Sequence, residues 1–366
     1  MKKTIALLAA GAALNISADG HKMMKMDAPT VYGKLNKVFT YIDQEDVHNR
    51  KTTDGVTDVS NSESRIGAKG HGEVLGVETH YKLELGVNST NKNDGGDEWR
   101  IRVRESLLKM KGKYGTVMLG QTYGVVVKQG RRSDPLQETI AGHQGDDMKN
   151  RVANAVKDLG FNDRSRADLI GYVSPSFHGL TYSLSQDRGE GFSNDTTDTN
   201  YGITTYEHLV RYQRDIGKVD VDLYVGLQSG ARAAAQVDEE TMTYGFNLGF
   251  NNFGLNFAMS TEEYDGNTNS NKDERERMFG ALTYEMNKNK YSFTYQTRED
   301  STDGSATAEY TQMAANWAHK CNKWATVNLT AMKYEKELQN TALTGDALKL
   351  QEADATILAA GIQLKF

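Results

Sequence analysis

Apolar and polar residues alternate with a period of two along most of the chain. In residues 357–366 every even position is apolar, whereas Gln363 and Lys365 occupy odd positions. Successive side chains of a strand point to opposite faces, so this period predicts strands with one apolar and one polar face. A helix does not fit the pattern, because a period of two would spread the apolar residues around its whole circumference.

The alternation predicts sixteen strands, separated by connections of two kinds. Eight long polar connections alternate with seven tight ones, as in transmembrane β-barrels, where loops on the outer side are long and periplasmic turns are short. The predicted strands cover residues 31–42, 63–71, 76–87, 99–111, 115–123, 166–174, 179–187, 202–214, 218–228, 240–250, 253–263, 275–286, 290–299, 307–319, 323–336 and 353–366.

We therefore predict an all-β fold, a 16-stranded antiparallel transmembrane β-barrel. Mean hydropathy is −0.63 and 25% of residues are charged, which also fits a soluble all-β binding protein. A water-filled barrel gives the same averages, because its lipid-facing residues occupy only every second position. The longest uncharged apolar run, residues 5–14, is too short for a membrane helix of about 20 residues.

The N-terminus has the pattern of a secretory signal peptide. Lys2 and Lys3 precede the apolar run 5–14, and a small residue suited to cleavage, Ala18, follows it. We expect a signal peptide over residues 1–18 and one barrel domain over 19–366; an N-terminal amphipathic helix is the alternative. The net charge of −6 suggests no nucleic-acid partner.

The order of several short motifs resembles that of the general diffusion porins of Gram-negative bacteria. The motifs are residues 31–35, 64–70, 114–120 and 172–180, together with the terminal Phe366. The resemblance implies a homotrimer in the outer membrane, surrounded by lipid and lipopolysaccharide. It also implies a third extracellular loop that folds inward, and a role for Phe366 as a signal to the outer-membrane assembly machinery.

Arginines at a spacing of two on one predicted strand indicate a basic wall inside the barrel. Arg100, Arg102 and Arg104 must share one face, and facing lipid would cost about 2 to 4 kcal/mol for each near the midplane. We therefore place them in the lumen. The full predicted wall consists of Lys34, Arg65, Lys69, Arg100, Arg102 and Arg104.

The longest connection, residues 124–165, is the predicted constriction loop, because loops beyond about 12 to 15 residues are usually functional. A basic wall opposite acidic loop residues would discriminate ions by charge. Basic residues also occur in this loop, so either sign of ion preference stays open. The acidic residues expected at the pore are Asp134, Glu138, Asp146 and Asp147, and the interspersed basic ones are Arg131, Arg132, Lys149 and Arg151.

The function predicted from these features is passive diffusion of small hydrophilic solutes and ions through a water-filled pore. A substrate-specific outer-membrane channel with a saturable solute site is the alternative. We predict no enzymatic activity, because no Ser-His or Asp-His pair stands out. No cofactor is expected, and no metal, because the eight histidines show no metal-ligand spacing.

Overall fold

The structure is a computed structural model of the chain. It describes residues 25–45, 51–58, 64–88, 100–137, 139, 141, 166–188, 204–232, 237–265, 272–302, 305–339 and 353–366. The signal peptide predicted over residues 1–18 lies outside these ranges and stays a prediction. Within the described residues, no helix is long and apolar enough to cross a membrane.

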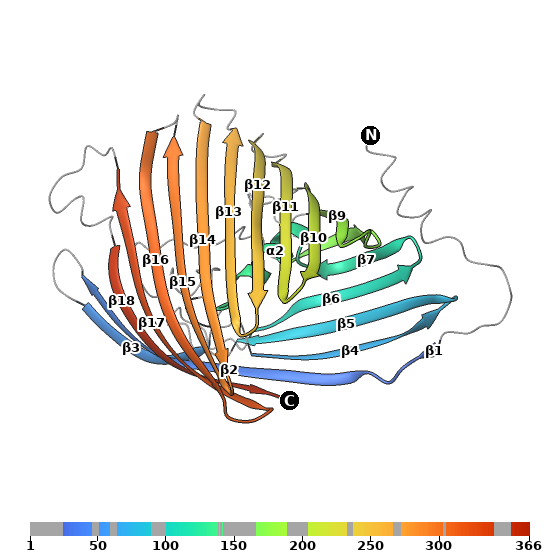
Figure 1. Ribbon diagram of the computed structural model, residues 1–366, viewed down its shortest axis with the longest axis horizontal. Helices are drawn as coiled ribbons and strands as arrows, with labels where there is room; N and C mark the ends of the chain where they lie inside the picture. The colour runs from blue at the N-terminus through green and yellow to red at the C-terminus, as the bar shows by residue number, and fades with distance from the viewer. Residues whose placement is uncertain are drawn as a thin grey trace.

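Antiparallel strands make up nearly all of the described chain (Figure 1). They are β1 (Lys25–Met26), β2 (Thr30–Glu45), β3 (Lys51–Asp58), β4 (Ser64–Val74), β5 (Val77–Asn88), β6 (Arg100–Gly112), β7 (Gly115–Thr122), β8 (Ala167–Val173), β9 (Leu180–Arg188), β10 (Thr204–Ile216), β11 (Val219–Arg232), β12 (Val237–Phe250), β13 (Phe253–Asp265), β14 (Lys272–Met286), β15 (Asn289–Thr302), β16 (Ser305–Lys320), β17 (Ala325–Leu338) and β18 (Ala353–Lys365).

These eighteen segments fill the sixteen strand positions of one closed barrel. The segments β3 and β4 pair with successive parts of β2 and together occupy one strand position. The short segment β1 continues the position of β2 and pairs with β4. The barrel closes because β18 pairs with β2 and β9 pairs with β10. The predicted 16-stranded antiparallel barrel is confirmed. One difference is β3, which lies where the sequence predicts a long polar link.

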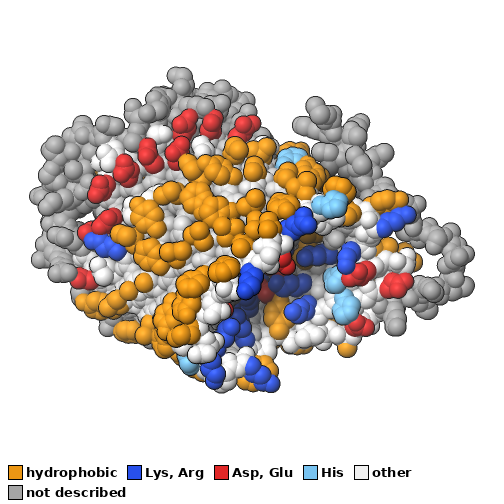
Figure 2. Space-filling model, in the orientation of Figure 1, with side chains coloured by type: hydrophobic (Ala, Val, Ile, Leu, Met, Phe, Trp, Pro, Cys, Tyr) orange, Lys and Arg blue, Asp and Glu red, His pale blue; other side chains and the backbone are white. Residues whose placement is uncertain are grey.

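Because of the period-two pattern, the residues of each strand alternate between the inner and the outer face of the barrel. On β18 the even residues, such as Leu358 at 51% exposure, lie on the outside, and the odd residues, such as Ile357 at 0%, lie inside. The same separation on the neighbouring strands produces a broad hydrophobic outer surface (Figure 2). Both predicted faces of this strand are therefore correct.

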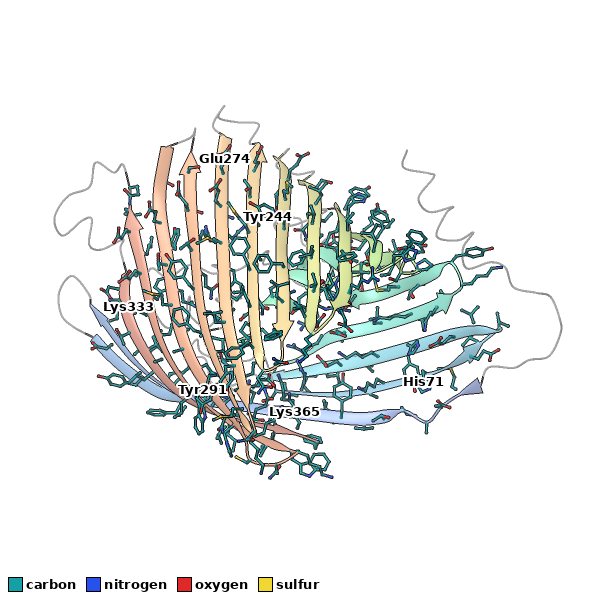
Figure 3. All side chains as sticks on the ribbon, viewed as in Figure 1. His71, Tyr244, Glu274, Tyr291, Lys333 and Lys365 are labelled. Carbon is teal, nitrogen blue, oxygen red and sulfur yellow. The ribbon has the colours of Figure 1, made fainter. Side chains whose placement is uncertain are left out.

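Short turns connect the strands at one end of the barrel, here called the turn end. The turn between β4 and β5 has positive φ at Leu75 (52°) and Gly76 (79°), and Asn251 (52°) has the same conformation between β12 and β13. Asparagine and glycine tolerate this left-handed region better than most residues, which explains their place in tight hairpins. Tyr291 lies near this end and Glu274 near the opposite end (Figure 3).

The last residue completes the seam of the barrel. The Gly33 amide donates to the Phe366 carbonyl at 2.8 Å, and the Phe366 amide donates to the Gly33 carbonyl at 3.1 Å. The Phe366 ring lies directly over Gly33, where a Cβ would overlap it. Glycine is therefore required at position 33 for this packing.

A bulge in β6 changes which of its residues face inward. Glu84 of β5 pairs with Glu105, but the next residue, Leu85, pairs with Val103, so Arg104 is the extra residue. Residues after a bulge switch faces relative to those before it. Glu105 and Lys109 therefore join Arg104 on the inner side, although strict alternation from Arg104 would place both against lipid.

Candidate pore constriction

The helix α2 (Val125–Ser133) lies inside the barrel, where the sequence predicts only a long loop. The Val126 amide donates to Glu207 Oε2 at 2.8 Å, and the Val125 amide donates to Ser185 Oγ at 3.1 Å. These contacts satisfy amides at the helix N-terminus, where a carboxylate is also favoured by the helix dipole. A Cβ on Gly226 of β11 would lie 2.7 Å from a Val126 methyl group, so glycine allows the helix to approach the wall.

Side chains of β11 and β13 hold the C-terminal half of α2. Gln129 Nε2 donates to Asp222 Oδ2 at 3.1 Å, and the Ser133 and Tyr224 hydroxyls are 3.0 Å apart. The Asn256 side chain donates to the Ser133 carbonyl at 2.8 Å. The helix is therefore fixed along the inner face of β9–β13.

Beyond α2 the chain reaches a different part of the inner wall. Leu136 and Ala141 are fully buried in an apolar cluster with residues of β2 and β16–β18, including Tyr334 and Ile357. Gln312 of β16 donates to the Ala141 carbonyl at 3.0 Å. The described residues 125–137, 139 and 141 thus contact the inner faces of β9–β13 and of β16–β18, and they narrow the lumen between these faces.

A cavity of about 820 Å³ lies on the turn-end side of α2, and most of its charged lining residues are cations. Lys82 is 2.8 Å from Glu105, and Arg211 is 2.6 Å from Asp222. Within the described chain, Lys109, Lys128 and Arg132 form no ion pair. The cationic lining residues are Lys69, Lys82, Lys109, Lys111, Lys128, Arg132 and Arg211, and Glu105 is the one lining carboxylate that the structure describes. In Figure 2, Lys and Arg side chains gather in a hollow beside the hydrophobic outer surface.

Glu84 brings two residues of the predicted basic wall together. Arg104 Nε donates to Glu84 Oε1 at 2.9 Å, with 2% and 3% of the two side chains exposed. Arg65 Nε lies 3.6 Å from the other oxygen of Glu84, to which the Tyr32 hydroxyl also donates. The buried carboxylate therefore neutralises part of the wall at this point.

The other members of the predicted wall are placed less uniformly. Lys34 is buried on β2 and is paired with Arg65 in the strand register. Lys69 Nζ lies 5.5 Å from the centre of the Tyr32 ring and lines the cavity. The side chains of Arg100 and Arg102 lie outside what the structure describes, so their place in the pore stays a prediction.

Of the four acidic loop residues predicted at the pore, the structure describes one, Asp134. Asp134 directly follows α2, is 2% exposed, and accepts the Leu136 amide at 2.7 Å through Oδ1. This contact stabilises the turn in which the chain leaves the helix. Glu138, Asp146 and Asp147 lie outside the described residues, as do Lys149 and Arg151.

The surroundings of Lys128 change its acidity. Burial lowers its pKa to about 8, and the positive charges of Lys109 and Arg132 act in the same direction. Both effects disfavour the charged ammonium. Lys128 is therefore still mostly charged at pH 7, but it loses its proton at a lower pH than an exposed lysine.

Several lumen cations were not singled out by sequence reasoning. Lys82 has a visible signal, since it alternates with Leu83 and Leu85 on a predicted strand and must share the inner face with Glu84. Lys109 has none, because its orientation depends on the bulge. Lys128 lies on a helix that begins with three valines, a run that favours a strand.

Comparisons with known proteins agree with this architecture. The family model described as Gram-negative porin matches residues 4–338. No curated protein sequence matches the chain significantly. The anion-selective porin from Comamonas acidovorans is similar in structure, with a TM-score of 0.69 and 18% identity over 93% of this chain and 99% of that one.

Two further solved structures show the same fold at low identity. The trimer form of OmpT, an outer membrane protein of Vibrio cholerae, has a TM-score of 0.62 and 15% identity, covering 93% of this chain and 100% of that one. OmpF of Salmonella typhi, solved in complex with daunomycin, has a TM-score of 0.62 and 14% identity with the same coverage.

Proposed function

Because the chain belongs to the Gram-negative porins, it is an outer-membrane diffusion channel, and we propose that it admits small hydrophilic solutes with a preference for anions. The observation that supports this preference is the cavity beside α2. Its described lining holds seven Lys or Arg side chains and one carboxylate. Unpaired cations in a narrow, low-dielectric passage attract anions and repel cations without binding either tightly.

The predicted basic wall takes part in this selection. In our proposal, Lys69 adds to the positive potential of the cavity, and Arg65 and Arg104 contribute less because Glu84 partly neutralises them. Lys34, Arg100 and Arg102 extend the wall toward the rest of the barrel. Residues 124–165 form the constriction loop, and its described part supplies Lys128 and Arg132 to the cavity. The Comamonas porin, which shares this fold, is anion-selective.

The oligomeric state and the assembly signal are also part of our proposal. We propose a homotrimer in contact with outer-membrane lipid and lipopolysaccharide, supported by the trimer form of the Vibrio OmpT structure. Phe366 then serves as the signal to the assembly machinery, and its backbone pairing with Gly33 also closes the barrel. Deletion of Phe366 is expected to lower the amount of folded, heat-modifiable barrel in the outer membrane.

Ion selectivity is tested in planar bilayers. With potassium chloride at different concentrations on the two sides, the zero-current potential gives the ratio of chloride to potassium permeability. We expect chloride to be the more permeant ion. Stepwise conductance with a preference for potassium would contradict the anion preference, and the absence of stepwise conductance would contradict the pore itself.

A further inference from the structure

An apolar groove of about 1230 Å³ lies on the outer face of the barrel toward the turn end, and none of its described lining residues is charged. Along this outer groove, aromatic residues of neighbouring strands lie directly opposite one another in the register. This aromatic row consists of Phe250, Phe253, Tyr284, Tyr291 and Trp317. Tyrosine and tryptophan are enriched where a membrane barrel passes from hydrocarbon to headgroups. The outer groove therefore ends at the level of the lipid headgroups.

The depth of the outer groove results from small residues between large ones. Ala315 of β16 and Ala331 of β17 face outward and are paired in the register. On either side of this pair lie Phe293 of β15 and Leu358 of β18. An unfilled depression lacks van der Waals contacts on one side, and a hydrocarbon chain supplies them. The shape and the apolar lining therefore suit the acyl chain of a lipid.

Lysines from two adjacent turns lie beyond the aromatic row. Lys288 follows β14, whereas Lys320 ends β16 and Lys323 lies in the turn after it. The Lys320 amide donates to the Lys288 carbonyl at 2.8 Å, so the two turns lie side by side. All three lysines are exposed, and they form no ion pair within the described chain. Their charge is therefore available to an external anion.

The outer surface has the opposite charge at its other margin. Carboxylates face outward there on β14–β17, the strands that carry the three lysines at the turn end. They are Glu276, Glu299, Glu309 and Glu337, which follow one another in the register. In Figure 2, acidic side chains line the upper margin of the hydrophobic outer surface, and Lys and Arg side chains lie at its lower margin. This charge distribution favours an anionic headgroup at the turn end.

We propose that the outer groove and the three lysines form a binding site for one anionic phospholipid of the leaflet at the turn end. The acyl chains fill the groove over Ala315 and Ala331, and the phosphate group contacts Lys288, Lys320 and Lys323. Lipid that only surrounds a barrel does not discriminate between headgroups, whereas this site does. The inference depends on the location of the chain in the outer membrane and goes beyond solute diffusion, because it is independent of the ion preference.

The test uses the position of Trp317 in the outer groove. The substitutions W99F and W324F remove the other two tryptophans of the chain, so fluorescence reports on Trp317 alone. The purified full-length protein is reconstituted at pH 7 in phosphatidylcholine bilayers that contain increasing fractions of brominated phosphatidylglycerol, whose acyl chains quench tryptophan on contact. Brominated phosphatidylcholine is the zwitterionic reference. We expect phosphatidylglycerol to quench along a saturating curve and to reach half of its effect at a fraction about fivefold lower than the reference.

Lysine variants test the headgroup contact. The triple variant K288Q/K320Q/K323Q should remove the preference, so that both brominated lipids quench Trp317 equally. K113Q is the control, because Lys113 is also an exposed turn lysine, 4.7 Å from the centre of the Tyr114 ring, and does not line the outer groove. It should keep the full preference.

A separate variant tests the acyl-chain contact. A331F fills the outer groove and should raise the half-quenching fraction of phosphatidylglycerol about threefold or more. Its matched control is A68F: Ala68 lies opposite the exposed Leu83 in the register and outside the groove, so the fraction should stay within about twofold of the wild type. Heat-modifiable migration on a gel confirms that each variant folds.

Three results would overturn the binding site. The first is equal quenching of Trp317 by the two lipids when all lysines are present. The second is a preference for phosphatidylglycerol that persists in the triple lysine variant. The third is the absence of quenching by either lipid, because a protein surface such as a second copy of the chain would then cover the groove. The chloride preference is measured separately from zero-current potentials, so each proposal can fail without the other.

Discussion

Two parts of the inner wall carry basic residues, and they differ in how the charge is neutralised. On β13–β15, Arg277 is 2.7 Å from Glu262, and Arg298 is 2.6 Å from Asp300. Arg275 lies between both carboxylates, at 3.3 and 3.1 Å. Each of these arginines therefore contacts at least one carboxylate, and each carboxylate contacts two arginines.

Around the cavity beside α2, the cations outnumber the carboxylates. Lys109 and Lys128 have no ion-pair partner within the described chain, and Arg131 and Arg166 share a tyrosine instead of a carboxylate. Paired charges stabilise the wall locally but cancel at a distance, whereas unpaired charges keep a potential that extends into the lumen. In our proposal, the first region stabilises the barrel and the second selects between ions.

The largest effect is expected from removing Glu84, the carboxylate that stabilises the basic side. In E84A, the buried Arg104 loses its ion pair at 2.9 Å. Removing one partner of a buried ion pair costs about 3 to 5 kcal/mol. We expect a clear decrease in the temperature at which the barrel loses its heat-modifiable migration.

The matched control is E78Q, near the turn end. Glu78 is about half exposed and contacts Lys111 at 3.4 Å and His80 at 2.8 Å. Exposed pairs contribute about 0 to 1 kcal/mol, so the transition temperature should hardly change. Equal destabilisation by E84A and E78Q would disprove the special role of Glu84.

The next largest effect concerns the neutralised region. R298Q removes a two-bond contact with Asp300, which keeps Arg275 at 3.1 Å. The loss of hydrogen bonds to a charged group should cost about 1.5 to 3 kcal/mol, measured by the same thermal transition. The chloride-to-potassium permeability ratio should change less in R298Q than in K128Q, a variant that neutralises a cation of the cavity beside α2. A larger change in R298Q would contradict our division of the inner wall into two regions.

The sequence was sufficient to predict features that depend on local alternation. On β18 the two faces differ at every position, so the strand, its direction in the barrel and its inner residues follow from the pattern. The inner positions of Lys82 and Glu84 carry the same signal in their spacing, although neither was predicted as a pore residue. The strand β3 was not predicted, because Lys51–Asp58 is polar on both faces and has no apolar alternation.

The features that define the pore depend on contacts between distant residues. The helix α2 begins with Val125–Val127, which favour a strand, yet its N-terminus is satisfied by Ser185 and Glu207. The inner position of Lys109 depends on the bulge at Arg104, and no local pattern marks that residue as extra. Sequence reasoning therefore predicted the barrel better than the side chains that line its narrow part.

A smaller effect is expected from neutralising Lys128 on the selective side. A unit charge about 7 Å from a permeating ion in water at 0.1 M salt, where the Debye length is about 10 Å, contributes about 0.3 kcal/mol. The contribution is favourable for chloride and unfavourable for potassium, so the two ions differ by about 0.6 kcal/mol, which corresponds to a factor of about 2 to 3 in their permeability ratio. K128Q should therefore lower the chloride-to-potassium permeability ratio by this factor, as measured from zero-current potentials. R298Q serves as the comparison because it removes one positive charge from the paired region. Equal decreases in the two variants would show that pairing does not determine the selectivity.

The smallest effect is a pH dependence of the anion preference. Lys128 has a pKa lowered to about 8 by burial and by the nearby Lys109 and Arg132, so it is charged below pH 8 and neutral above it. The chloride-to-potassium permeability ratio should be highest near pH 7 and decrease by about twofold at pH 9, a change no larger than that of K128Q. K128R keeps its charge over this range, so its ratio should stay constant. If the ratio in K128R falls as much as in the wild type, another group is responsible for the dependence.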